Sequence, residues 1–287
     1  MISILIPVRN YDASELVKDI HRQLEDIAIP AEIIVMNDAS DASYSSFFEE
    51  IKKLPLASVV ISEKRSGAMK ARIKLAELAK YNHLLFLDAD NKINSKDFLS
   101  KWLKAIRKNY DLVSGGTVFP NEIPAADYIL CWKYRKERET RPGLTITRNL
   151  LIKKSVFLSV NFPEELLEFY GHDDTWLGIQ LKKKGIKIKE IKNPCLNLGI
   201  DTTEDFIKKS EAALRNLKLM RKFETAGNIS GEVKLFRTAY ILQQTGLSFF
   251  FKIYYKVLEK SIRKNIYSQN PSLKKFDYYR LYYFLSL

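Results

Sequence analysis

Two aspartates, Asp88 and Asp90, directly follow the apolar run from His83 to Leu87. Side chains two positions apart on a strand point to the same side, so both carboxylates can reach one cation or one ligand. Hard oxygen donors of this kind suit Mg²⁺ or Mn²⁺ held together with substrate phosphates. The pair also fits a plain polar end to a strand, with Asp90 beginning a turn. This spacing alone leaves both interpretations open.

A second acidic pair, Asp173 and Asp174, precedes a helical pattern that is closed by three lysines and Gly185. A carboxylate within hydrogen-bond reach of a reacting hydroxyl can act as a general base. The alternative is structural, because acidic residues in the first turn of a helix stabilise its positive end. Basic residues and a glycine suit the other end of the same helix.

Strand and helix patterns alternate through the first hundred residues, which predicts right-handed crossovers and a mostly parallel, Rossmann-like sheet. The expected strands are 2–6, 32–36, 57–61, 83–87 and 111–116, and the expected helices are 14–27, 43–53, 66–80 and 95–106, the last capped by Ser95. Polar clusters follow three strands, at Arg9-Asn10, Asn37-Asp38 and Asp88-Ala89-Asp90. Parallel strands end at one edge of a sheet, so these clusters predict a nucleotide site there. The plainer explanation is that every loop after a strand is polar.

The pattern changes after Pro120. Residues 121–143 read as a long loop with a helix, suited to an acceptor-binding element or a lid. Further short strands are expected at 145–152, 186–191 and 194–198, and the chain is helical from Thr203. We therefore expect two domains, an α/β domain with the predicted nucleotide site at 1–200 and a helical extension at 201–287.

The chain is basic, with a net charge of +13 and a pI of about 9.4. Its last forty residues interleave aromatic and basic side chains, a composition that suits an anionic membrane surface. The alternative is a helical subdomain that packs its aromatics on the catalytic core. No RNA-reading motif is present, so no nucleic-acid partner is expected. The sequence shows no signal peptide, no apolar run of membrane-spanning length, and no metal-ligand spacing at Cys131 and Cys195. These features predict a cytoplasmic protein. Together with the aromatic and basic tail, they predict a peripheral location on the inner face of the membrane.

Several segments in register resemble family 2 glycosyltransferases of the GT-A fold. The matching segments are 3–10, SILIPVRN against SIIIPVYN; 32–40, EIIVMNDAS against EIIVVDDGS; 86–90, FLDAD against FLDxD; and 171–178, GHDDTWLG against GxEDTxLG. Leu181 and Gly185 continue the last motif, and 147–152 resembles the strand that carries an acceptor-side Asn, here Asn149. The resemblance covers about residues 1 to 200.

The resemblance implies a bacterial enzyme of polysaccharide or cell-envelope biosynthesis. Such an enzyme moves a sugar, with inversion at the anomeric carbon, from a nucleotide sugar to a hydroxyl of a glycan or lipid-linked acceptor. We interpret the donor as a UDP-sugar. Asp90 then binds a divalent metal, Mn²⁺ or Mg²⁺, and Asp88 contacts the nucleotide sugar or supports the site. Asp174 is the general base, with Asp173 beside it. The other implied donor residues are Pro7, Arg9, Asn10, Asn37 and Asp38, and the implied acceptor-side residues are Asn149, Trp132 and His172.

This sequence departs from the family pattern at several of these positions. Arg9 replaces the usual Tyr, Asn37 replaces the first Asp of a pair, and Asp173 replaces Glu. Asn197 stands where many relatives have a His that completes the metal shell. These changes leave open a nucleotide-sugar-binding protein that has lost catalysis. A D-x-D phosphatase is a further alternative, but there the pair should follow the first core strand, and Lys92 stands where Thr or Val is expected.

Overall fold

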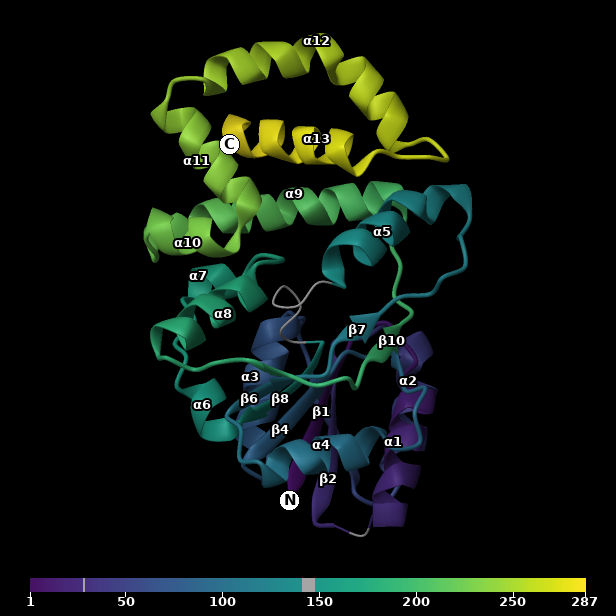
Figure 1. Ribbon diagram of the computed structural model, residues 1–287. Coiled ribbons are helices and arrows are strands. Elements are labelled where there is room, and N and C mark those ends of the chain that lie inside the picture. Colours follow the sequence, from purple (N-terminus) through teal and green to yellow (C-terminus); the bar gives the residue numbers. More distant parts are fainter. Residues whose placement is uncertain (28, 141–147) are drawn as a thin grey trace. The chain divides into compact units, whose positions relative to one another are not determined.

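The computed structural model describes residues 1–27, 29–140 and 148–287 (Figure 1). The chain forms two compact units that alternate along the sequence. Unit 1 comprises Met1–Pro120, Thr140–Asn161 and Leu181–Gly199, and unit 2 comprises Asn121–Glu139, Phe162–Gln180 and Ile200–Leu287. Two segments before residue 200 therefore belong with the C-terminal helices, which the predicted division at that residue did not foresee.

Unit 1 contains a seven-stranded mixed sheet in the order β3-β2-β1-β4-β8-β6-β9. The neighbours β3, β2, β1 and β4 are parallel, while β8 is antiparallel to both β4 and β6. The strands are β1 (Ile2–Val8), β2 (Ala31–Asp38), β3 (Ala57–Ser62), β4 (His83–Leu87), β6 (Leu112–Ser114), β8 (Asn149–Lys153) and β9 (Lys189–Glu190). The predicted mostly parallel α/β sheet with flanking helices is confirmed, although β9 is shorter than the expected strand.

A small second sheet places the last segment of unit 1 beside the turn after β4, which carries Asp88 and Asp90. It consists of β5 (Asn91–Lys92), β10 (Cys195–Asn197) and β7 (Thr117–Val118), in the order β5-β10-β7. Strand β10 runs antiparallel to β5, with Asn197 opposite Asn91. Residues far apart in sequence thus meet directly after β4.

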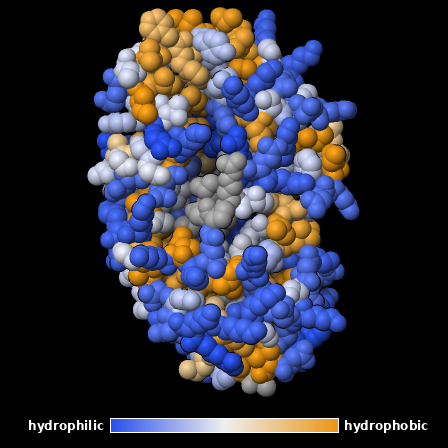
Figure 2. Space-filling model, viewed as in Figure 1, coloured by the Kyte–Doolittle hydropathy of each residue, from blue (hydrophilic) through white to orange (hydrophobic). Residues whose placement is uncertain are grey.

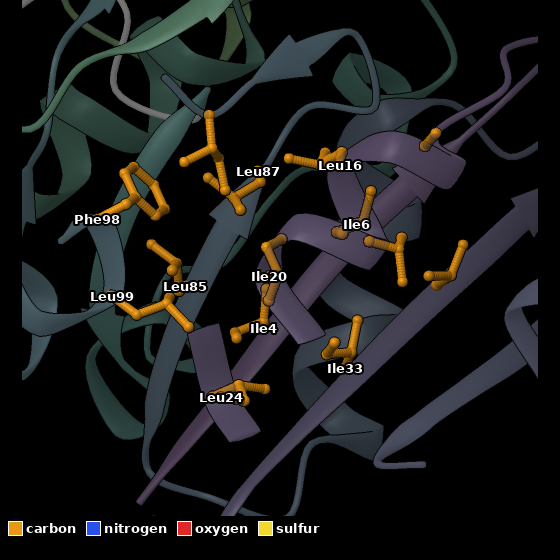
Figure 3. Packing of buried hydrophobic residues seen from close by; sticks show 14 of the residues in the cluster. Ile4, Ile6, Leu16, Ile20, Leu24, Ile33, Leu85, Leu87, Phe98 and Leu99 are labelled. Carbon is orange, nitrogen blue, oxygen red and sulfur yellow. The ribbon is translucent and has the colours of Figure 1, made fainter. Parts of the chain in front are cut away.

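Alternating side chains of the central strands build two apolar layers. Ile4, Ile6, Leu85 and Leu87 pack with the apolar stripe of α1, which includes Ile20 (Figure 3). The next residues along the strands face the other side, where the Phe86 ring lies 4.9 Å from that of Phe157. The helices of unit 1 are α1 (Ser14–Ile27), α2 (Ser45–Lys52), α3 (Ala68–Leu78), α4 (Phe98–Arg107) and α6 (Lys154–Leu158), with a 3₁₀ turn η1 (Ala42–Tyr44). Asp97 precedes α4 as its N-cap residue, in place of the predicted Ser95.

Unit 2 is helical, as predicted for the chain from Thr203 onward. Its elements are η2 (Ala126–Tyr128), α5 (Ile129–Tyr134), a π-helical turn η3 (Arg135–Glu139), α7 (Glu164–Leu167), α8 (Asp173–Lys183), α9 (Thr203–Leu219), η4 (Met220–Lys222), α10 (Ala226–Glu232), α11 (Lys234–Gln244), α12 (Ser248–Ile266) and α13 (Leu273–Ser286). Aromatic residues form its core: Phe206 and Phe276 pack together, and Tyr255 stacks on Tyr282 with ring centroids 4.0 Å apart. In the described part of the chain, no helix is long and apolar enough to cross a membrane.

Candidate active site

Asp88 lies at the carboxyl end of β4 between two arginines. Arg72 of α3 donates from Nη2 to Asp88 Oδ1, and its side chain is only 6% exposed. Arg148 Nε lies 3.8 Å from Asp88 Oδ2. Separating Arg72 from Asp88 would leave an uncompensated buried charge. The ion pair therefore holds the end of β4 against α3. The geometry fits the supporting role among the two roles that the sequence suggested for Asp88.

Asp90 contacts the residue that the sequence marked as a departure from the family. Asn197 Nδ2 donates to Asp90 Oδ1 at 2.5 Å and to Asn91 Oδ1 at 3.1 Å. The Leu198 backbone N–H also donates to the Asp90 carbonyl, at 2.8 Å. The small sheet thus places β10 against the D-x-D turn, and the expected place of Asn197 in a metal shell stays a prediction.

A divalent metal fits this arrangement if the donor supplies most of its ligands. The described residues contain no group of three or more His, Cys, Asp and Glu side chains suited to holding a metal. Mg²⁺ is commonly bound by one or two carboxylates together with water and substrate phosphates, and Asp90 offers one such carboxylate. An amide can turn to present oxygen instead of nitrogen, so Asn197 is compatible with a bound cation.

Asp38 is buried at the end of β2 and holds the loop that leads into α3. Its Oδ1 accepts hydrogen bonds from the backbone N–H and the hydroxyl of Ser66, both at 2.6 Å, and its Oδ2 accepts from Gly67 N–H at 2.9 Å. Two carboxylate oxygens offer about four acceptor positions, so the side chain keeps capacity for a further donor. Its predicted contact with the base or ribose stays a prediction.

The loops after β1 and β2 are joined by polar side chains. Asn10 Nδ2 donates to Asp41 Oδ2 at 2.9 Å, and Asn10 Oδ1 accepts from Asp41 N–H at 2.8 Å. Asn37 Oδ1 accepts from Ser40 N–H at 2.8 Å. The structure therefore gives Asn10 and Asn37 a loop-supporting contact. Arg9 is exposed, and Pro7 is partly buried within β1.

Sequence reasoning missed Tyr11 beside the D-x-D turn. Its side chain is partly buried and lines a cavity of about 220 Å³ together with Ala89, Asn91 and Leu198. Burial and the nearby negative charge of Asp90 raise the pKa of the Tyr11 hydroxyl. An aromatic residue just after Arg9-Asn10 was the signal available in the sequence.

Asp173 and Asp174 occupy the first turn of α8, in unit 2. The Thr175 backbone N–H donates to Asp174 Oδ1 at 2.7 Å. Gly171 and His172 precede them with φ angles of +88° and +63°, a left-handed turn that favours glycine. A Cβ on Gly171 would also lie 2.6 Å from Ala213 Cβ, so glycine is required here.

Asn216 holds this turn from α9 and was not found by sequence reasoning. Its side chain is 1% exposed and donates to the carbonyls of Leu166, at 3.1 Å, and Gly171, at 2.6 Å. His172 Nδ1 lies 3.1 Å from Thr175 Oγ1. Burial and the positive charge of Arg280 lower the pKa of His172 to about 3, so the imidazole is neutral at pH 7.

The remaining acceptor-side residues lie in different surroundings. Asn149 is 1% exposed, and its Nδ2 donates to the carbonyls of Gly116, at 2.9 Å, and Asn193, at 2.8 Å. Its side chain thus ties β8 to the loop after β6, and burial at this level does not fit contact with an acceptor. Trp132 is half-buried on α5, with Lys136 Nζ 4.7 Å from its ring centre.

Unit 1 therefore brings Asp88, Asp90 and Asn197 together, with Asp38 at the end of β2 in the same sheet. The acidic pair of α8, His172 and Trp132 belong to unit 2. Within unit 1, the strand-end cluster combines the Asp90 carboxylate, which accepts from Asn197, with the Asp88 carboxylate, which faces two guanidinium groups. Such a cluster is suited to a metal-bound diphosphate.

Three solved structures with a similar fold illustrate the match. S. aureus TarS 1–349 in complex with UDP superposes with a TM-score of 0.50 at 20% identity, over 75% of this chain and 65% of that one. The mannosyltransferase PcManGT from Pyrobaculum calidifontis, with GDP-Man and Mn²⁺, gives a TM-score of 0.51 at 15% identity over 77% and 64% of the two chains. Mannosyl-3-phosphoglycerate synthase from Rubrobacter xylanophilus gives 0.54 at 14% identity over 77% and 74%. The chain thus spans somewhat less than two thirds of the TarS fragment's length.

No curated protein matches the sequence. The family model described as glycosyl transferase family 2 matches residues 3–159, more than half of the 287 residues. The matched region contains β1, β2, β4 and the D-x-D turn, the elements on which the strand-end cluster is built. The chain belongs to glycosyl transferase family 2.

Proposed function

We propose that this glycosyltransferase moves a sugar from a UDP-sugar to a hydroxyl of a glycan or lipid-linked acceptor, with inversion at the anomeric carbon and with the help of Mn²⁺ or Mg²⁺. The observation that carries the proposal is the place of Asp90 directly after β4, beside the Arg72–Asp88 pair and at the same sheet edge as Asp38. Open α/β sheets bind their ligands at this edge.

Asp90 holds the metal in this proposal, and Asn197 lies next to it. When bound, the ion offsets the negative charge that the leaving diphosphate gains. Arg148, 3.8 Å from Asp88, adds positive charge at the same strand end. Asp38, at the end of β2, contacts the base or ribose.

Asp174 takes the proton of the acceptor hydroxyl, with Asp173 beside it. A sugar hydroxyl is a poor nucleophile, so a carboxylate that accepts its proton speeds the attack. Direct displacement inverts the anomeric carbon because the attacking oxygen enters opposite the leaving diphosphate. The role rests on the match of 171–178 to the family motif and on the ordered turn that Asn216 holds.

The choice of UDP is supported by two of the similar structures, which are complexes with UDP and UDP-GlcNAc. Another similar structure contains GDP-Man and Mn²⁺, which makes GDP the natural comparison. For the acceptor, we propose a cell-envelope glycan or its lipid-linked precursor, met at the cytoplasmic side of the membrane.

Asp174→Asn tests the assignment of the base. We expect loss of about a thousandfold in transfer rate, in the range of general-base catalysis, with UDP binding unchanged by thermal shift in Mn²⁺. Asp26→Asn, which removes an exposed carboxylate of α1, is the matched control and should keep full activity. Unchanged turnover in Asp174→Asn would rule out this base.

A binding protein without catalysis is the second candidate, favoured by the amide donor at Asp90. It predicts that wild-type protein binds UDP yet turns over no donor in a screen of UDP- and GDP-sugars with glycan and lipid acceptors. Measurable transfer, or metal-dependent hydrolysis of any nucleotide sugar in that screen, excludes this candidate.

A further inference from the structure

Helix α12 carries exposed apolar side chains over its first half. Tyr255, Ile262 and Ile266 are buried against the other helices of unit 2. The helical spacing places five apolar or aromatic residues on the opposite, outward face, where a surface helix normally has polar residues. The set consists of Phe249, Phe250, Ile253, Tyr254 and Val257, which are 64%, 65%, 49%, 52% and 78% exposed. Figure 2 shows hydrophobic atoms gathered at the top of the view, where Figure 1 labels α12.

The second half of α12 is basic on the same side. Lys260 and Lys264 are exposed and follow Val257 at helical spacing on the outward face. The one acidic residue of this helix, Glu259, accepts hydrogen bonds from Lys256, at 3.0 Å, and Arg263, at 3.3 Å. Positive charge therefore dominates this half of the helix.

Neighbouring residues extend the apolar area. Tyr240 and Ile241 of α11 are exposed, as is Leu247 in the turn between α11 and α12. We call these residues together with the outward face of α12 the α12 patch. An exposed apolar surface bordered by lysines marks a contact site, since scattered single hydrophobic residues would carry no such meaning.

We propose that the α12 patch binds the surface of an anionic lipid bilayer. Phe249 and Phe250 are exposed over most of their surface, so their rings can enter the boundary between headgroups and acyl chains. Lys260 and Lys264 then lie near the headgroups, where each basic residue strengthens attraction to an anionic surface. Charge complementarity and the aromatic-basic composition of one helical face both select this partner.

A second copy of the chain is a poorer occupant. In a twofold dimer the same surface is used by both subunits, so the contact would gather Lys260 and Lys264 of both copies in one interface, and the patch has no acidic residue to offset them. Like charges brought together in this way oppose association. A dimer formed through the patch is therefore an outcome that contradicts the proposal.

Vesicle flotation with the full chain tests the proposal without any substrate, so its result is independent of the transferase assignment. We expect binding to phosphatidylcholine vesicles that contain about 30% phosphatidylglycerol, and weak binding to phosphatidylcholine alone. Phe249→Ala/Phe250→Ala should weaken binding about a hundredfold, because the variant lacks two phenyl groups that the wild type buries in the bilayer. Lys260→Gln/Lys264→Gln should weaken it about twenty-five-fold, about fivefold for each lysine.

The controls change equivalent residues elsewhere. Lys104→Gln/Lys108→Gln removes two exposed lysines at α4 and its C-cap, and Ile61→Ala/Ile123→Ala removes two exposed apolar side chains. Both should bind as the wild type does, and all variants change exposed positions, so their melting temperatures should match. Absence of wild-type binding, equal binding by α12 variants and controls, or sedimentation as a dimer that Phe249→Ala/Phe250→Ala dissociates would overturn the proposal.

Discussion

At the scale of single residues, the contact between Asn197 and Asp90 is the feature that most shapes the proposed chemistry. The amide donates to the carboxylate at 2.5 Å, so a cation that binds Asp90 competes with this hydrogen bond. The sequence pointed to Asn197 as a gap in a metal shell, and the pairing of β10 with β5 places it next to Asp90. The metal shell stays a prediction, and the hydrogen bond between Asn197 and Asp90 could not be predicted from the sequence.

Asn197→Asp supplies a second carboxylate of nearly the same size. Without metal, two adjacent carboxylates repel, so we expect a lower melting temperature than that of the wild type. With metal, the new ligand should reduce about tenfold the Mn²⁺ concentration that gives half of the thermal stabilisation. Asn121→His, which adds an exposed potential ligand elsewhere, is the control. An unchanged Mn²⁺ requirement would show that position 197 does not adjoin the metal.

At the scale of elements, α3 and β4 are connected through the Arg72–Asp88 pair. Arg72 is almost fully buried, while the Asp88 side chain is 23% exposed. The D-x-D signal in the sequence contained no sign of this partner, because the apolar spacing of α3 says nothing about which polar residue faces inward. The pair joins α3 to the end of β4, which is consistent with the supporting role that we propose for Asp88.

Arg72→Met should destabilise the protein by about 2 kcal/mol, less than the roughly 3–5 kcal/mol for a fully buried pair, because water reaches Asp88. The further change Asp88→Asn should recover part of this loss, since it removes the uncompensated charge. Urea unfolding measures both, with Arg107→Met on the exposed side of α4 as the control. A loss no larger than that of the control would contradict the proposed role of the pair.

At the scale of the whole molecule, the sequence predicted individual strands and helices well, but it did not predict which distant segments pair with one another. The parallel strands and α1 followed from apolar periodicity, which each segment carries by itself. Strand order beyond β4 depends on contacts between distant segments, and so does the assignment of 121–139 and 162–180 to unit 2. Tyr11 and Asn216 escaped notice for the same reason, because their partners lie far away in sequence. The expected strand 145–152 begins outside the described residues, and β8 covers its second half.

The central claim is that the end of β4 binds a nucleoside diphosphate with a divalent metal through Asp90. Isothermal titration of UDP into the full chain, with Mn²⁺ and then with EDTA, tests it most directly, and Asp90→Asn is the paired variant. We expect binding in Mn²⁺ that weakens about a hundredfold in EDTA and in Asp90→Asn, in line with the loss of a charged contact. Equal UDP affinity in all three measurements would contradict the claim.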